Sequence, residues 1–273
     1  MFNECPVSSI ETSGKYVGLP DGIMGNSEVG HMNIGAGRIV KQNLVRINDA
    51  IESDILRNNS NLNKIFQHVN ENNSTLHILG LLSDGGVHSH LDHYKYILQT
   101  ARYSNVEKIS LHVITDGRDT SPTSGINYVR NLESYVQEDK GFRIASICGR
   151  YYAMDRDSRW ERIEKSYRMY IHGEGEKHID SNSAIQTAYD NKITDEFILP
   201  TIISEPAPIQ DGDAVLVMNF RADRMRQIVT VINDPDFSNF KTEKLDILFT
   251  CMTKYQENFT YPVLFESEKI KNI

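Results

Sequence analysis

The chain has 273 residues, of which 39% are hydrophobic and 24% charged, and its formal net charge is -8. This composition is typical of a globular protein with a sizeable core, and the acidic balance argues against nonspecific binding of nucleic acid, whose phosphates attract cationic surfaces. No apolar run approaches the roughly 18 residues of a membrane span, and the three cysteines, Cys5, Cys148 and Cys251, predict reduced thiols in a cytoplasmic protein.

Residues 1–41 show little periodicity. Residues 7–12 suit one short strand, and the glycines and proline at 18–22 predict a turn. Residues 24–31 then form a predicted loop with Ser27 between two glycines, which let a bulky anion approach the backbone. A serine in such a loop is either a nucleophile, which needs a base or a metal to activate it, or a turn or cap residue.

From residue 43 onward, apolar stripes at helical spacing alternate with apolar runs of strand length. The predicted helices lie at 44–55, 62–69, 91–101, 126–136, 160–171, 184–188 and 225–232. The predicted strands lie at 76–82, 109–115, 142–148, 214–220 and 245–251. Strands that alternate with helices over this length predict an α/β fold, a mostly parallel sheet with helices on both faces.

Charged loops follow four of these strands, and together they carry five arginines, namely Arg118, Arg150, Arg156, Arg221 and Arg224. In a parallel sheet such loops emerge at the carboxyl edge, where open α/β sheets bind ligands. Guanidinium groups bind phosphate and carboxylate through paired hydrogen bonds, so the pattern predicts a small, multiply charged anion as ligand. The alternative is a set of surface ion pairs with neighbouring aspartates, each worth about 0–1 kcal/mol.

Two further patterns suggest chemistry. His88-Ser89-His90-Leu91-Asp92-His93 matches the metal-binding motif of metallo-β-lactamase-like hydrolases, whose imidazole and carboxylate ligands hold zinc or iron. That fold needs further ligands from later loops, and the later histidines fall in a predicted strand or near a helix end. Asp119 follows Arg118, whose charge keeps the carboxylate ionised, so Asp119 is either a proton acceptor or a loop cap.

Long motifs at 24–38, 80–90, 116–120, 146–160 and 219–224 resemble the cofactor-independent phosphoglycerate mutases, of the alkaline phosphatase superfamily. The resemblance runs almost continuously from about residue 17 to about residue 265. It implies interconversion of 3-phosphoglycerate and 2-phosphoglycerate in glycolysis and gluconeogenesis, with two Mn²⁺ ions. In that family, the serine that matches Ser27 carries the phosphoryl group as phosphoserine and ligates one manganese ion.

The same resemblance implies the roles of the site residues. Substrate would be bound by His88, Arg118, Asp119, Arg150, Arg156, Arg221 and Arg224. Asp119 would also accept a proton during phosphoryl transfer. Residues 1–41 would be a remnant of the phosphatase-like domain, 42–268 the substrate-binding domain, and 269–273 the start of a linker.

Most of the metal ligands expected for the family match nothing in this sequence. We therefore expect the chain alone to bind phosphoglycerate without turnover. The alternatives are a non-catalytic module for a phosphorylated ligand and the His-x-His-x-Asp-His hydrolase. We expect a small-molecule partner only, with no nucleic acid and no membrane, and a cytoplasmic enzyme that is monomeric when full length.

Overall fold

The computed structural model describes residues 8–25 and 27–267. Its contacts divide the chain into two compact units, Met1–Ser53 with Ser267–Ile273, and Asp54–Glu266. We call them the N-terminal unit and the sheet unit. The division falls later than the boundary after residue 41 that the sequence suggests, and the assignment of the two units to family domains stays a prediction.

The N-terminal unit contains a short 3₁₀ helix η1 (Gly14–Val17) and two α-helices, α1 (Ser27–Ala36) and α2 (Asn43–Glu52). The strand predicted at 7–12 is not formed over residues 8–12, and residue 7 lies outside the described part of the chain. A short strand needs a partner strand to hydrogen-bond with, and here a single bridge between Ser13 and Met24 forms next to this segment.

The loop predicted at 24–31 is also corrected, because Ser27 is the first residue of α1. The Asn33 side chain fixes this helix to the segments around it. Its amide group donates to the carbonyl oxygens of Val17 at 3.1 Å and Val29 at 2.8 Å, and its oxygen accepts from the Val40 amide at 2.7 Å. A polar side chain that bridges three backbone segments gives no periodic signal in a sequence.

The sheet unit alternates strands and helices. Its elements in chain order are η2 (Ile55–Asn58), α3 (Ser60–Asn72), β1 (Leu76–Leu81), α4 (Leu91–Tyr103), β2 (Ile109–Thr115), α5 (Gly125–Val136), β3 (Phe142–Gly149), α6 (Arg150–Ala153), α7 (Trp160–His172), β4 (Glu176–His178), α8 (Ser181–Asp190), η3 (Asp195–Phe197), β5 (Thr201–Ile203), β6 (Ala214–Val217), α9 (Arg226–Asn233), β7 (Leu248–Thr253) and β8 (Val263–Phe265). Helix α3 begins where the Asn59 side chain accepts from two backbone amides, and α7 ends at Gly173 in the left-handed conformation.

The strands form one sheet in the order β4-β5-β3-β2-β1-β6-β7-β8. All neighbouring pairs are parallel except β3 with β5. The prediction of a mostly parallel α/β fold is therefore confirmed. No helix of the described residues has the length and apolar character needed to cross a bilayer.

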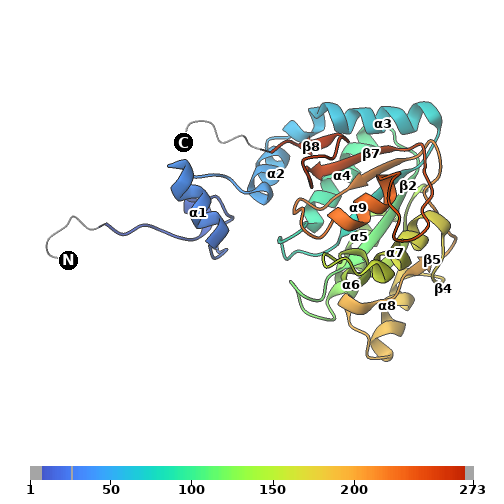
Figure 1. Cartoon of the computed structure of the whole chain (residues 1–273). Helices are drawn as coiled ribbons and strands as arrows, with labels where there is room; N and C mark the ends of the chain where they lie inside the picture. The colour runs from blue at the N-terminus through green and yellow to red at the C-terminus, as the bar shows by residue number, and fades with distance from the viewer. Residues whose placement is uncertain (1–7, 26, 268–273) are drawn as a thin grey trace. The chain divides into compact units, whose positions relative to one another are not determined.

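Helices cover both faces of the sheet (Figure 1). Successive side chains of a strand point to opposite faces. On one face, Leu79 and Leu81 of β1 pack in a single apolar cluster with residues of α7 and α9. Helix α3 contacts β1, β6 and β7, and its buried apolar side chains lie outside that cluster. Cys148 and Cys251 are buried free thiols, and Cys5 lies outside the described residues.

A buried polar chain crosses the strands inside the core. Asp213 accepts from His77 Nε2 at 3.1 Å, His77 Nδ1 lies 2.8 Å from His112 Nε2, and His112 Nδ1 lies 2.8 Å from the Ser146 hydroxyl. Because the Asp213 carboxylate can only accept, each imidazole nitrogen in this series of hydrogen bonds is fixed as either a donor or an acceptor. The Ser146 hydroxyl donates at the other end. Burial, followed by the nearby His77 and Arg143, lowers the pKa of His112 well below its usual value.

Candidate functional site

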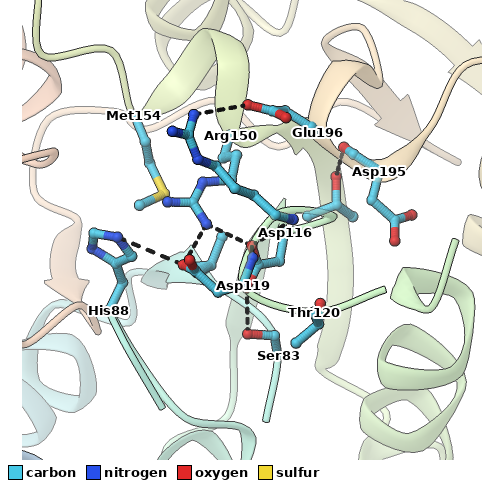
Figure 2. Close-up of polar contacts among 12 residues, drawn as sticks. Ser83, His88, Asp116, Asp119, Thr120, Arg150, Met154, Asp195 and Glu196 are labelled. Atoms are coloured by element: carbon cyan, nitrogen blue, oxygen red, sulfur yellow. Dashed lines mark hydrogen bonds and ion pairs between the residues drawn. The ribbon is translucent and has the colours of Figure 1, made fainter. Parts of the chain in front are cut away.

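The loop after β2 is organised around the buried carboxylate of Asp116. Its Oδ1 accepts from the backbone amides of Arg118 at 3.2 Å and Asp119 at 3.0 Å, and its Oδ2 accepts from the Ser83 hydroxyl at 2.8 Å (Figure 2). Burial alone would raise the pKa of Asp116, but these hydrogen bonds and the Arg150 guanidinium hold it below its usual value. Sequence reasoning missed this residue, although it is the first after a strand and precedes a glycine.

Arg150 is the first residue of α6, directly after β3, and its side chain is only 2% exposed. One of its guanidinium nitrogens donates to Asp116 at 2.5 Å and to Asp119 at 2.6 Å. Two predicted site residues, Arg150 and Asp119, are therefore in direct contact. Figure 2 shows the two carboxylates on either side of the guanidinium nitrogen.

His88 lies between two carboxylates. Its Nε2 is 3.7 Å from Asp119 Oδ2, and its Nδ1 is 4.0 Å from Asp223 Oδ1. Burial and the charge of Arg150 lower the pKa of His88 to about 4, so the imidazole is neutral at neutral pH. Its Nδ1 is buried without a hydrogen-bond partner among the described residues, an unsatisfied polar atom that a ligand group brought to it would satisfy.

Three of the other four arginines come from the segments after β3 and β6. Arg156 donates to Asp223 at 2.9 Å, and Arg221 lies 3.1 Å from the same carboxylate. Arg224 instead donates to the Met154 carbonyl oxygen at 3.1 Å. Burial and the neighbouring cations Arg150, Arg156 and Arg118 lower the pKa of Arg224. Mutual repulsion of this kind identifies a place where an anion would be stabilised.

Arg118 is the most exposed of the five, with 56% of its side chain accessible. Its guanidinium lies 3.6 Å from the Glu196 carboxylate, which comes from η3. No periodicity or motif in the sequence marks Glu196, because η3 has three residues and lies in a connection between longer elements. Five of the seven predicted substrate-binding residues are thus joined by contacts through Asp116, Asp119 and Asp223, namely His88, Asp119, Arg150, Arg156 and Arg221. The Arg118 backbone amide also donates to Asp116, and Arg224 lies near enough to three of the arginines for their charges to lower its pKa.

Ser27 belongs to the N-terminal unit, and the other predicted site residues belong to the sheet unit. The Ser27 hydroxyl is exposed and lies 3.2 Å from His31 Nδ1. That nitrogen also lies 2.6 Å from the Ser27 carbonyl oxygen, an acceptor only, so Nδ1 carries the proton. His31 therefore cannot act as a base toward Ser27 in this arrangement.

The side chains of the His-x-His-x-Asp-His motif have separate roles. His88 faces the carboxylates described above, and His90 caps α4 by accepting from the Asp92 amide at 3.2 Å. His93 is buried with its ring 5.7 Å from that of Phe220, and burial lowers its pKa to about 3. The described residues contain no cluster of three or more His, Cys, Asp or Glu side chains that could hold a metal ion.

The family model for the N-terminal part of 2,3-bisphosphoglycerate-independent phosphoglycerate mutases, described as "BPG-independent PGAM N-terminus", matches residues 47–257. The chain belongs to this family. That assignment confirms the resemblance drawn from the motifs at 80–90, 116–120, 146–160 and 219–224, which lie within the matched residues.

Relatives named 2,3-bisphosphoglycerate-independent phosphoglycerate mutase include one from Clostridium perfringens, 47% identical over 261 residues that cover 94% of this chain and 51% of that protein. One from Syntrophotalea carbinolica is 47% identical over 272 residues, which cover 98% of this chain and 53% of that protein. Crystal structures of Leishmania mexicana phosphoglycerate mutase at low cobalt concentration match with a TM-score of 0.87 and 33% identity, covering 96% of this chain and 51% of that one. The chain thus spans about half the length of these relatives.

Proposed function

We propose that the sheet unit binds 3-phosphoglycerate and 2-phosphoglycerate, and that the chain serves the interconversion of the two through a phosphoserine at Ser27. The observation that carries the proposal is the arginine cluster at the carboxyl edge of the sheet, with Arg224 crowded by other cations. A phosphorylated hydroxy acid carries a phosphate and a carboxylate, which are the two groups that guanidinium forks bind best.

Within this proposal, each residue has a distinct task. The arginines neutralise and orient the two anionic groups, and the neutral His88 offers a ring nitrogen to a phosphate or hydroxyl oxygen. Asp119 is 20% exposed, so its carboxylate can reach a ligand while Arg150 holds its position. A carboxylate in hydrogen-bond reach of the glycerate hydroxyl can take its proton as the phosphoryl group arrives.

We also propose dependence on Mn²⁺, which the family resemblance implies, with Ser27 as one ligand. The described residues do not by themselves fit two such ions, because they contain no cluster of three metal-ligating side chains. No step of the reaction is therefore derived through the metal. Since His31 cannot deprotonate Ser27 here, we propose that this chain alone holds phosphoglycerate without converting it.

Titration calorimetry with 3-phosphoglycerate tests the binding proposal. Arg156→Ala and Arg221→Ala each remove a charged hydrogen-bond donor, worth about 1.5–3 kcal/mol, so each should weaken binding about 10- to 150-fold. Arg168→Ala is the matched control, because Arg168 pairs with Glu174 on the surface of α7. Equal affinity of the wild type and both site variants would refute the proposed site.

The second candidate is a non-catalytic module that binds a phosphorylated acid, and the unactivated Ser27 hydroxyl favours it. An assay for interconversion of 3- and 2-phosphoglycerate with Mn²⁺ and without bisphosphoglycerate separates the two candidates. Steady turnover that Ser27→Ala abolishes would show that the chain builds a complete reaction centre. Binding without turnover that becomes turnover when the part of a relative not matched by this chain is added in trans would support the first candidate, whereas binding without turnover under both conditions would support the module.

A further inference from the structure

The segment η3 packs against the site formed by the five arginines. A Cβ atom on Gly117 would lie 2.8 Å from the Glu196 amide nitrogen, and one on Gly149 would lie 2.3 Å from the Glu196 carbonyl oxygen. The loop that carries Arg118 and the end of β3, just before Arg150, thus both approach the backbone of Glu196 directly. Real Cβ atoms essentially never lie so close to backbone atoms. The absence of a side chain at Gly117 and Gly149 therefore allows the Glu196 carboxylate to lie within the site.

Asp195 fixes this segment in place. Its buried carboxylate accepts from the Gly125 amide at 2.7 Å and from the Tyr189 hydroxyl at 2.5 Å. Its carbonyl oxygen accepts from the Thr115 hydroxyl at 2.7 Å, at the end of β2. The carboxylate of the next residue, Glu196, therefore starts from a rigid backbone and not from a mobile loop.

Two kinds of arginine–carboxylate pair occur in the site. Arg150 is buried and hydrogen-bonded to Asp116 and Asp119 at 2.5 and 2.6 Å, so this pair is fixed. Arg118 is half exposed, and its 3.6 Å separation from Glu196 exceeds a hydrogen-bond distance. The Arg118 side chain can therefore leave Glu196 at little cost when a better anion arrives.

The charges of the site's own side chains nearly cancel. Five guanidinium groups face four carboxylates, those of Asp116, Asp119, Glu196 and Asp223, while His88 is neutral. A phosphate monoester brings a charge of about -1.5 to -2 at neutral pH, to which the carboxylate of the ligand adds another. A phosphoglycerate thus carries more negative charge than the site has spare positive charge, and each internal carboxylate opposes its binding.

We propose that Glu196 is an affinity-determining residue of this site, an internal counter-ion that competes with the anionic ligand for Arg118. The inference rests on the proposed function where it names phosphoglycerate as the ligand. Glu196 differs from Asp116, Asp119 and Asp223, which either hold a buried guanidinium or contact several site residues. Among the described residues its ion-pair partner is Arg118, so a change of its charge leaves the contacts of the other three carboxylates in place.

Removing the charge of Glu196 should therefore tighten anion binding. Exposed ion pairs contribute little, so we expect Glu196→Gln to lower the dissociation constant about two- to fivefold. The gain should vanish in an Arg118→Ala background, because no guanidinium is then released. This double-mutant cycle separates competition for Arg118 from a general effect of charge on the site.

Calorimetry on the full chain, with 3-phosphoglycerate and separately with inorganic phosphate, measures the cycle. Glu196→Ala is the second variant, and thermal melts confirm that each variant is folded. Glu174→Gln is the matched control, since it removes the same charge from the exposed pair with Arg168 and should leave both dissociation constants unchanged.

The outcomes of these measurements decide whether Glu196 competes with the ligand for Arg118. Weaker or unchanged binding in both Glu196 variants would overturn the proposal, as would a gain that persists in Arg118→Ala. If the wild type binds inorganic phosphate but not 3-phosphoglycerate, the proposed function fails while the phosphate cycle still decides the role of Glu196. If neither anion binds any variant, both proposals are overturned.

Discussion

Replacing Asp116 with alanine should strongly destabilise the sheet unit. The side chain accepts four hydrogen bonds, and both Asp116 and its partner Arg150 are 2% exposed, so solvent screens neither charge. Removing one partner of a buried pair typically costs about 3–5 kcal/mol. Because Arg150 keeps Asp119 at 2.6 Å, we expect the lower end, about 3 kcal/mol.

Urea unfolding followed by the fluorescence of Trp160, the single tryptophan, measures this loss. Asp157→Ala is the control, because Asp157 is 55% exposed and pairs with Arg159 at the surface. This substitution should change the free energy of unfolding by less than about 1 kcal/mol. An Asp116→Ala chain that unfolds at the same urea concentration as the control would refute the reasoning.

The pH dependence gives a second check on Asp116. Its folded pKa lies below the unfolded value, so its stabilising contribution is present above about pH 4 and is lost as the pH falls through the folded pKa. Asp116→Asn keeps an acceptor oxygen and removes the charge. The difference in unfolding free energy between wild type and Asp116→Asn should therefore shrink below about pH 4, and a constant difference would contradict the assigned charge state.

Three further predictions concern separate features. Arg224→Ala should weaken binding of inorganic phosphate about tenfold or more by calorimetry, whereas Arg168→Ala should not change it. Because the pKa of His112 is strongly lowered in the folded state, the unfolded chain binds an extra proton below about pH 6.5, and stability should fall there by up to about 1.4 kcal/mol per pH unit. Urea unfolding at pH 5–7 should show a shallower slope for His112→Gln. Gly149→Ala should lower the melting temperature, because its Cβ would meet a backbone carbonyl oxygen at 2.3 Å, whereas Gly35→Ala has open space and should not.

The long buried strands could be predicted because burial on both faces leaves a run of apolar residues, as in 76–82. The strands β4, β5 and β8 could not, because three residues are too few to show a period. Helix α1 could not be predicted for another reason. It contains Gly30 and Gly35 and has almost no separation of apolar from polar faces, so its sequence is typical of a loop.

The site, like the fold, could be predicted from the sequence only in part. The arginines could be placed at one edge of the sheet because strand ends determine where loops emerge. The carboxylates that pair with these arginines could not be assigned from the sequence. Glu196, for example, is far from Arg118 in the sequence, and it reaches Arg118 because Gly117 and Gly149 leave room for the Glu196 backbone. The position of a carboxylate in three dimensions decides whether an arginine is fixed or available, and neither spacing nor composition encodes that choice.

The strand order determines when the sheet can close during synthesis. Strand β1 pairs with β6, and the adjoining Thr75 amide donates to Asp213, 138 positions later in the chain. At about 5–20 residues per second, the ribosome needs on the order of ten seconds to make the intervening segment. During that interval β1 has an unpaired, almost wholly apolar edge, which is the kind of edge that neighbouring chains extend into aggregates. Chaperone contact with the nascent chain is therefore most valuable before residue 214 emerges, and less so once β6 has joined the sheet.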